Sequence, residues 1–226
     1  MSGDAPTYRL YGYWRSSSSY RARIVLNLKG LAYEQVAVHL LKDGGQHNDP
    51  AFAPKSPLRQ LPVLEVDGPE GPRQLTQSLA IAEYLEERHP EPALYPTDAW
   101  ARARAREIAE MVNSGIQPLQ NLRVLRSLQA AGVDPKAWCR EVIARGLFAV
   151  ETRLKETVGR HAVGDAVGIV EAVLIPQLYA ARRFGVDLEP FPEIRCVEAG
   201  CLELEAFRAA HPDAQADAPP PDERTP

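Results

Sequence analysis

The chain has 226 residues, of which 45% are hydrophobic, and a formal net charge of -4. This length allows one large domain or two small ones with a sizeable buried core. The slightly acidic balance gives no general attraction to nucleic acid or anionic lipid, and no apolar run is long enough to span a bilayer. We therefore expect neither nucleic acid nor a membrane as a partner.

The first six residues lack the charged start and apolar stretch of a signal peptide, so the chain is predicted to be cytoplasmic. Cysteines 139, 196 and 201 are odd in number and lack C-x-x-C spacing, which argues against a disulfide framework and a dithiol redox motif. The five histidines lack the i, i+4 spacing of a helical metal site. No metal is predicted.

The first predicted elements are a strand and a helix. Alternation of the side chains between Tyr8 and Trp14 predicts the strand. Helical spacing from Ala22 to Leu26 predicts the helix, and Gly30 is a plausible stop.

Four consecutive serines, Ser16 to Ser19, stand where this helix begins. A helix start carries unpaired N–H groups and a partial positive charge, so hydroxyls placed there can hold an anion such as a thiolate. Alternatively, one serine is the N-cap and the others form a polar turn. A hydrolase-type nucleophile is a poor alternative, because the run has no G-x-S-x-G elbow.

The next elements alternate between strand and helix patterns. A second strand is predicted at Tyr33–Val38, a proline-headed strand at Leu61–Gly68, and a short returning strand at Gln74–Thr76. An amphipathic helix follows at Leu79–Arg88, with Ser78 as its predicted N-cap. This order predicts a small mixed sheet with helices packed on it.

Beyond residue 98 the patterns are almost wholly helical. The predicted helices are Asp98–Ser114, Gln117–Ala131, Pro135–Thr157, Val170–Arg183 and Glu193–Ala210. The predicted organisation is thus a mixed α/β domain at residues 1–90, a linker at 91–97, an all-helical domain at 98–212 and a disordered tail at 213–226.

Several blocks together resemble the zeta class of the glutathione transferase superfamily, also known as maleylacetoacetate isomerases. The blocks are Tyr13-Trp14-Arg15-Ser16-Ser17 with Arg21, Lys42–Gln46, Gln60-Leu61-Pro62, Gln77–Ile81, Gly115–Leu122, Pro176-Gln177, Arg183-Phe184 and Val186–Leu188. The resemblance covers the chain from Tyr8 to about Pro212. It implies a fold of class α/β plus all-α, in which a thioredoxin-like N-terminal domain precedes an all-helical C-terminal domain.

The resemblance also implies glutathione as cofactor. Ser16, with Ser17 next to it, would donate its hydroxyl to the sulfur and favour the thiolate. Leu61 would pair with the cysteinyl part through its backbone, ahead of a cis peptide bond to Pro62. The implied glutathione-binding residues are Ser16, Ser17, Ser18, His47, Leu61, Pro62, Gln77, Ser78, Gln117, Asn121 and Arg123.

The implied reaction is the cis–trans isomerisation of maleylacetoacetate to fumarylacetoacetate, a step of tyrosine and phenylalanine breakdown. Arg15 and Arg183 are candidates for binding the substrate carboxylates, since a guanidinium makes paired contacts with a carboxylate. In the helical part, Gln117 and Asn121 are expected to share one helix face because they are four residues apart. The family implies a homodimer.

Two departures from the class pattern stand out. Ser18 and Tyr20 occupy positions where most zeta-class chains carry cysteine and tryptophan. Gly168 and Glu171 replace the ends of a Ser/Thr-x-x-Asp capping box, which predicts a helix start less stable by about 1 kcal/mol.

Two other functions stay open from the sequence. One is a glutathione transferase or maleylpyruvate isomerase acting on another electrophile, with Tyr179 and Ala180 as positions that would set the difference. The other is a non-catalytic binding module of the same fold. This last function is disfavoured because the chain retains five residues that the glutathione site would use: Ser16, Ser17, Pro62, Gln77 and Ser78.

Overall fold

The computed structural model describes residues 7–223, which divide into two compact units. Of the described residues, 7–92 form the first unit together with a segment that begins at Glu205. The second unit is formed by Ala93–Leu204.

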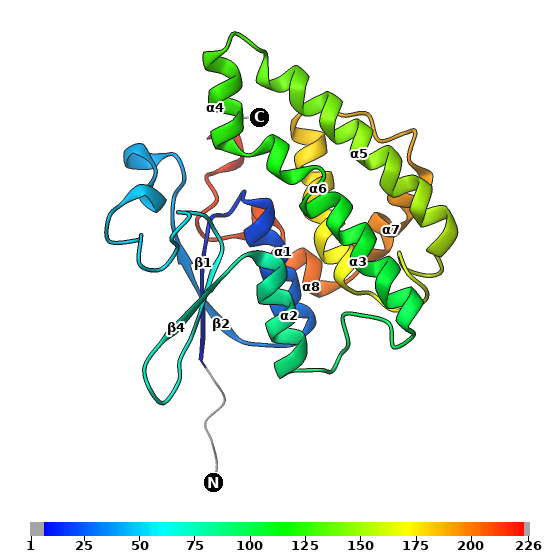
Figure 1. Ribbon diagram of the computed structural model, residues 1–226, viewed down its shortest axis with the longest axis horizontal. Helices are drawn as coiled ribbons and strands as arrows, with labels where there is room; N and C mark the ends of the chain where they lie inside the picture. Colours follow the sequence, from blue (N-terminus) through cyan, green and yellow to red (C-terminus); the bar gives the residue numbers. More distant parts are fainter. Residues whose placement is uncertain (1–6, 224–226) are drawn as a thin grey trace. The chain divides into compact units, whose positions relative to one another are not determined.

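The first unit is built on a mixed four-stranded sheet (Figure 1). Its strands are β1 (Tyr8–Gly12), β2 (Tyr33–Ala37), β3 (Val63–Val66) and β4 (Arg73–Thr76). The order across the sheet is β2-β1-β3-β4, with β1 parallel to β2 and the other two pairs antiparallel. The four strands lie where the sequence predicts them.

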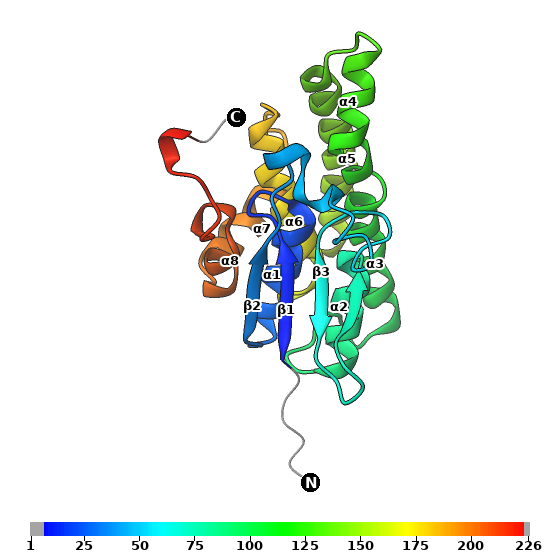
Figure 2. The same ribbon diagram turned by 90° about the vertical axis from the view of Figure 1, so that its left-hand side faces the viewer.

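Two helices, α1 (Ser17–Leu28) and α2 (Ser78–Arg88), cover one face of this sheet (Figure 2). Leu10 and Leu64 of the strands are fully buried. Ile24, Ile81 and Leu85 from the two helices complete this core. Burial of these large apolar side chains stabilises the unit and holds both helices against the sheet.

The opposite face of the sheet carries a cluster of charges around Glu65. Its carboxylate accepts from Arg9 at 2.6 Å, from Lys55 at 2.6 Å and from Gln74 at 2.9 Å. Burial raises the pKa of Glu65, but the hydrogen bonds from Lys55, Gln74 and Arg9 outweigh it and lower the pKa to about 2. Lys55 also lies 4.5 Å from the centre of the Tyr11 ring. The cluster therefore ties the long loop after β2 to the sheet.

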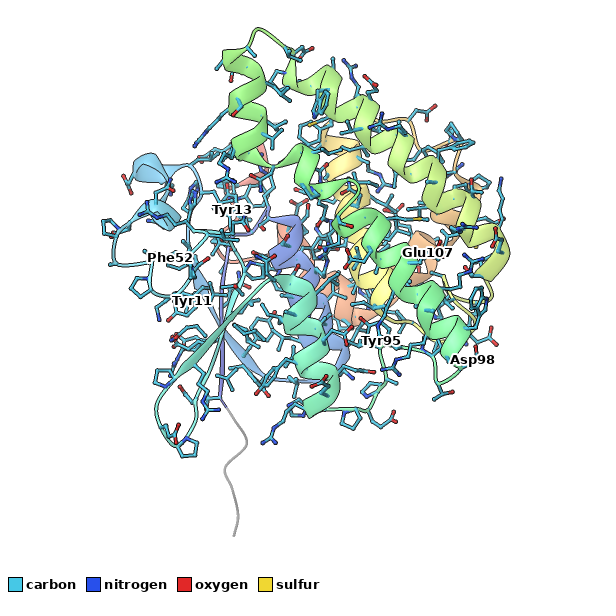
Figure 3. All side chains as sticks on the ribbon, in the orientation of Figure 1. Tyr11, Tyr13, Phe52, Tyr95, Asp98 and Glu107 are labelled. Atoms are coloured by element: carbon cyan, nitrogen blue, oxygen red, sulfur yellow. The ribbon has the colours of Figure 1, made fainter. Side chains whose placement is uncertain are left out.

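An aromatic contact holds the same loop a second time. The rings of Tyr11 and Phe52 meet edge to face, 6.3 Å apart, and Figure 3 shows the two side by side. Phe52 is buried with Val38 and Val63 in a small cluster of its own.

The segment after residue 204 packs against α1 and belongs to the first unit. Its helix α8 (Glu205–Ala210) receives a hydrogen bond from Asn27 Nδ2 to the Ala206 carbonyl at 3.0 Å. Arg23 Nε donates to the Ala210 carbonyl at 2.9 Å. The segment continues through two short 3₁₀ helices, Pro212–Ala214 and Pro221–Glu223.

This arrangement differs from the boundaries expected from the sequence. The pattern at Glu193–Ala210 predicts one helix of the second domain, and composition predicts a disordered tail from residue 213. Instead, that helix divides into α7 (Pro192–Leu202) and α8, and the following residues contact the first unit. The contacts come from side chains far away in the chain, which explains why local composition does not reveal them. Residues 224–226 lie outside the described part of the chain.

The second unit is all-helical. Its α-helices are α3 (Ala99–Asn113), α4 (Leu122–Ala130), α5 (Pro135–Thr157), α6 (Ile169–Arg183) and α7. Helix α3 packs against both α5 and α6, and α7 packs against α5 and α6. The bounds of α3 and α5 agree with the predicted ranges to within one residue. Asp98 caps α3 and Asp134 caps α5 through side-chain bonds of 2.8 and 2.9 Å. Within residues 7–223, no helix has the length and apolar character needed to cross a membrane.

The predicted helix at Gln117–Ala131 is broken in the structure. Gln117–Gln120 form a 3₁₀ turn with Pro118 in its first positions, and α4 begins only after Asn121. Asn121 is extended, and its side chain accepts from the Arg123 N–H at 3.0 Å as the N-cap. The expectation that Gln117 and Asn121 share a helix face is therefore wrong, because Asn121 stops one turn and starts the next.

At the start of α6, which departs from the class pattern, side-chain hydrogen bonds satisfy the backbone N–H groups. Glu171 accepts from the Gly168 N–H at 2.9 Å and from the Ala162 N–H at 2.8 Å. A Cβ at Gly168 would lie 2.3 Å from the Leu94 carbonyl oxygen, which itself accepts from the Ile169 N–H at 2.9 Å. Gly168 thus makes room for a backbone contact, and Glu171 keeps one half of the capping box and binds a further N–H.

Candidate functional site

The serine run occupies the start of α1, as the sequence predicts. Ser16 is the N-cap, and its Oγ accepts from the Ser19 N–H at 3.2 Å. Ser17 and Ser18 are the first two helical residues, and all three are half-buried. Accepting the cap bond leaves the Ser16 hydroxyl hydrogen able to donate outward. Both interpretations of the run, a cap and an anion site, are compatible with this geometry.

Ser19 holds the loop that leads from β1 into α1 through a buried hydrogen bond. The sequence does not predict this role. Ser19 is fully buried, and its Oγ accepts from the Tyr13 N–H at 3.4 Å. The Ser16 N–H donates back to the Tyr13 carbonyl at 3.0 Å, which closes a turn. A serine on the buried face of a helix is the signal that could have found this contact.

A second helix start lies at α2, with a correction to the predicted cap. Gln77, not Ser78, holds the N-cap position, with a left-handed φ of 68° and no side-chain cap bond. Ser78 is the first helical residue, and its buried Oγ accepts from Arg21 Nη1 at 2.8 Å. Because Ser78 Oγ is the acceptor in this bond, its hydroxyl hydrogen can donate to another group.

Sequence reasoning gives Arg21 no role of its own, although it stands in one of the recognised blocks. Its signal is a charged side chain on the buried face of α1, where it has no exposed surface at all. Buried charges require partners, which makes such a residue informative.

The chain between β2 and β3 contributes the remaining predicted residues of the first unit. The Leu61–Pro62 peptide bond is cis, as expected, and Pro62 is buried. Gln77 Nε2 reaches Gln60 Oε1 at 3.5 Å, which brings the start of α2 beside this step. His47 lies in a short 3₁₀ turn, Gln46–Asn48.

Arg15 precedes the cap of α1 and lies over the ring of Trp14, with 5.3 Å between the guanidinium carbon and the ring centroid. This cation–π contact favours one direction of the long Arg15 side chain. Arg15 thus stands one residue from the Ser16 hydroxyl on the same loop.

The second unit places its predicted residues on separate elements. Gln117 is half-buried in the 3₁₀ turn, whereas Asn121 and Arg123 flank the start of α4 and Asn121 is exposed. Arg183 is half-buried at the end of α6 and stacks on Phe184 at 4.5 Å. Tyr179 is half-buried one turn earlier, and Ala180 is buried.

The first unit can therefore hold an anionic or easily ionised ligand. Two helix N-termini, each with a serine able to donate, are joined through the Arg21–Ser78 bond. The cis proline step and Gln77 lie next to the second of these starts. Among the described residues, no group of three His, Cys, Asp or Glu side chains could hold a metal ion. This arrangement fits a ligand with a thiol and a carboxylate.

Sequence comparison identifies known proteins that are similar to this chain. The family model "Glutathione S-transferase, N-terminal domain" matches residues 10–93. The maleylacetoacetate isomerase of Mus musculus is 45% identical over 210 residues, covering 93% of this chain and 94% of that protein.

Two solved structures are also similar. A maleylacetoacetate isomerase of Anaeromyxobacter dehalogenans, with bound dicarboxyethyl glutathione and citrate in the active site, has a TM-score of 0.90, 52% identity and full coverage of both chains. A holo maleylpyruvate isomerase, a bacterial zeta-class glutathione transferase, has a TM-score of 0.87 and 44% identity over 93% of this chain and all of that one. The chain belongs to the maleylacetoacetate isomerase family, the zeta class of the glutathione transferases.

Proposed function

We propose that this protein is a glutathione-dependent cis–trans isomerase that converts maleylacetoacetate to fumarylacetoacetate. The observation that carries the proposal is the Ser16 hydroxyl at the start of α1, capped on one side and able to donate on the other. It occurs in a chain 52% identical to an isomerase whose structure contains a dicarboxyethyl conjugate of glutathione. Such a conjugate carries carboxylated carbon on the sulfur, as an adduct with an unsaturated diacid would.

The proposed role of Ser16 is to hold the sulfur of glutathione as a thiolate. A hydroxyl that donates to sulfur stabilises the charged form, as do the N–H groups of Ser17 and Ser18 and the helix dipole. When bound, glutathione supplies a thiolate that adds to the conjugated cis double bond, which allows rotation before elimination returns the trans alkene. Ser16 keeps its proton throughout and needs no general base.

The other groups of the first unit would bind the peptide part of glutathione. Ser78, oriented by Arg21, and Gln77 are placed to bind the glutamyl carboxylate at the start of α2. Leu61 would use its backbone N–H and C=O, with Pro62 fixing the adjoining turn. His47 is proposed for the glycyl end.

Cationic and polar residues complete the proposed site. Arg15 and Arg183 would bind the substrate carboxylates, and a nearby positive charge would also stabilise the enolate that forms on addition. Gln117, Asn121 and Arg123 are proposed as further contacts to glutathione from the helical unit. We further propose a cytoplasmic homodimer that acts in tyrosine and phenylalanine breakdown.

The test is conversion of maleylacetoacetate by the purified full-length protein, with and without glutathione. We expect formation of fumarylacetoacetate only when glutathione is present, with no net consumption of the thiol. Absence of turnover despite glutathione binding would contradict the proposed substrate, and turnover without glutathione would contradict the proposed cofactor.

A second candidate, maleylpyruvate isomerase, is supported by the 44% identity to the holo zeta-class structure. The same assay with maleylpyruvate distinguishes the two, since the proposed primary function predicts a higher kcat/KM for maleylacetoacetate. A non-catalytic module would bind glutathione or its conjugates but convert neither substrate. The retained hydroxyl donors at both helix starts argue against it.

A further inference from the structure

The peptide groups of Trp14 are held by residues outside the loop that contains them. Its N–H donates to Asp217 Oδ2 at 2.9 Å, and its carbonyl accepts from Arg23 Nη2 at 3.0 Å. Asp217 belongs to the segment after α8, 203 residues away in the chain, and Arg23 lies on α1. Trp14 itself is buried, 3% exposed, and its bond to Arg23 is buried, whereas its bond to Asp217 is part-buried.

Asp217 is in turn fixed in place. Its second oxygen, Oδ1, accepts from Gln35 Nε2 of β2 at 3.2 Å. Just before it, Gln215 Nε2 donates to the carbonyls of Ala209 and His211 at 2.9 and 2.8 Å, which folds the segment back onto α8. One carboxylate therefore joins the edge strand of the sheet to the loop before α1.

Helix α8 anchors this segment on the same structural unit. Arg23 donates both to the Ala210 carbonyl of α8 and to the Trp14 carbonyl of the loop. The loop is thus fixed on one side by a guanidinium and on the other by a carboxylate. Charge-assisted hydrogen bonds of this kind are shorter and stronger than neutral ones.

The position of Trp14 determines that of the Ser16 hydroxyl. Only one residue separates them, and the turn between them is closed by the Ser16 N–H to the Tyr13 carbonyl at 3.0 Å. A shift of the Trp14 peptide would therefore move the N-cap and its hydroxyl together. Displacements of about 1 Å at a reacting group can reduce a rate about a hundredfold.

We propose that Asp217 is a positioning residue for the thiolate site, which holds the Trp14 peptide and through it sets where the Ser16 hydroxyl meets the sulfur of glutathione. This inference rests on the proposed glutathione-dependent function. In this proposal the C-terminal segment affects the reaction by holding the loop before α1 in place. It does not touch the reacting atoms.

The charge of Asp217 acts in the opposite direction to this positioning. A carboxylate near the sulfur would by itself disfavour the thiolate, so removing its charge alone should lower the thiol pKa or leave it unchanged. Loss of positioning should raise that pKa. The sign of the change therefore distinguishes the two effects.

The experiment compares full-length wild type, Asp217→Ala and Asp217→Asn. Asparagine keeps an oxygen that accepts from the Trp14 N–H, whereas alanine does not. Asp222→Ala is the matched control, because it removes an exposed carboxylate of the same segment. Each protein is measured for the pKa of bound glutathione, from the ultraviolet absorbance of the thiolate against pH, and for kcat and KM with maleylacetoacetate.

We expect Asp217→Ala to raise the pKa of the bound thiol and to lower kcat at neutral pH about tenfold, with KM for the substrate little changed. Asp217→Asn should restore both values to near those of wild type, and Asp222→Ala should match wild type throughout.

Three results would overturn the proposal. One is an unchanged thiol pKa and kcat in Asp217→Ala. Another is a lower melting temperature with unchanged thiol pKa, which would make the contact merely structural. The third is an Asp217→Asn protein as impaired as Asp217→Ala, since the bond to the Trp14 N–H that asparagine keeps would then not position the site. The thiol pKa requires only glutathione binding, so a wild type that binds glutathione without isomerising maleylacetoacetate contradicts the proposed reaction and still tests Asp217.

Discussion

Ser16 combines two roles in one side chain, and substitutions can separate them. Its Oγ caps α1 by accepting from the Ser19 N–H, while its hydrogen is proposed to donate to sulfur. Loss of an N-cap costs about 1 kcal/mol of stability, whereas loss of the donor acts on the thiol pKa. Stability and chemistry should therefore respond differently to each replacement.

We expect Ser16→Ala to lower the unfolding free energy by about 1 kcal/mol, to raise the pKa of bound glutathione and to reduce turnover at least about tenfold. Ser16→Thr keeps both the cap and the hydroxyl and serves as the control. Denaturant unfolding, thiolate titration and the isomerase assay measure the three effects. If Ser16→Ala retains wild-type turnover and thiol pKa, the donor is not Ser16, and Ser17 becomes the next candidate.

Glu65 makes a separate prediction about acid stability. Its pKa of about 2 in the folded protein is below the ordinary value of 4.5. The ionised carboxylate therefore stabilises the fold fully above pH 4.5, and this contribution is lost as the pH falls from 4.5 toward about 2. Its partners Arg9 and Lys55 are about a third exposed, so solvent screens part of the effect.

We expect Glu65→Gln to lower the unfolding free energy at neutral pH by on the order of 2 kcal/mol, with the difference from wild type disappearing near pH 2. Glu70→Gln is the matched control, because Glu70 pairs with Arg73 at a site where its side chain is 86% exposed. Unfolding measured in denaturant across this pH range gives the comparison. A constant difference at all pH values would contradict an ionic origin.

At the scale of elements, the start of α6 shows that backbone packing can require a residue other than the one a sequence motif would place there. The class pattern would place a capping hydroxyl at position 168, and the sequence alone predicts a weaker helix start there. Leu94 instead brings its carbonyl to within 2.3 Å of where a Cβ would lie, and Glu171 satisfies the Gly168 N–H. Glycine is the residue that this contact permits.

We expect Gly168→Ser to destabilise the protein by about 1–3 kcal/mol, despite restoring a preferred N-cap residue, because either the Leu94 carbonyl or the helix must move. Gly200→Ala is the control, since Gly200 lies within α7 and has open space where a Cβ would be added. That change should stabilise by up to about 1 kcal/mol through helix propensity. A stabilising Gly168→Ser would show that the class pattern applies here after all.

Most elements can be predicted from the sequence because their signals are local. Alternation predicts the strands, and helical patterns predict α3 and α5 to within one residue of their observed ends. The break at Asn121 escapes prediction because an asparagine within a helical pattern is as compatible with a polar face as with a cap. The N-cap of α2 is missed for a similar reason. Gln77 takes this position with a left-handed backbone, and Ser78, the more usual cap residue, becomes the first residue of the helix.

The predicted site residues divide along the same line. Ser16 and Pro62 stand out through helix-start and proline chemistry, which one stretch of sequence displays. Arg21, Ser19 and Asp217 act through hydrogen bonds to residues that are distant in the chain or buried inside a helix. The partners in these contacts depend on the finished tertiary structure. A polar side chain on the buried face of α1 gives a local hint for Ser19 and Arg21, but no local pattern identifies Asp217.

At the scale of the whole molecule, the first unit is assembled from both ends of the chain. Arg23 is fully buried, and burial, partly offset by Tyr33 and Asp217, lowers its pKa to about 10. One of its partners is the Ala210 carbonyl. Without α8 this guanidinium would lose that partner, and the adjoining face of α1 would be exposed to water.

We expect truncation after Leu204 to lower the melting temperature of the first unit more than that of the second. The lost contacts lie on α1 and on the edge strand β2. Calorimetry or hydrogen exchange on the truncated and full-length chains gives the comparison. Equal loss of protection in both units, or none in the first, would contradict the assignment of this segment to the first unit.

The discontinuity of the first unit has a consequence for protein synthesis. A ribosome makes the sheet and its helices first, yet the partner that completes α1 is translated only after the whole helical unit. The first unit therefore cannot complete its folding until residues beyond 204 emerge, and until then Arg23 lacks its bond to the Ala210 carbonyl. The ability to ionise a thiol would then appear late, as a property of the completed chain, and not of its first ninety residues.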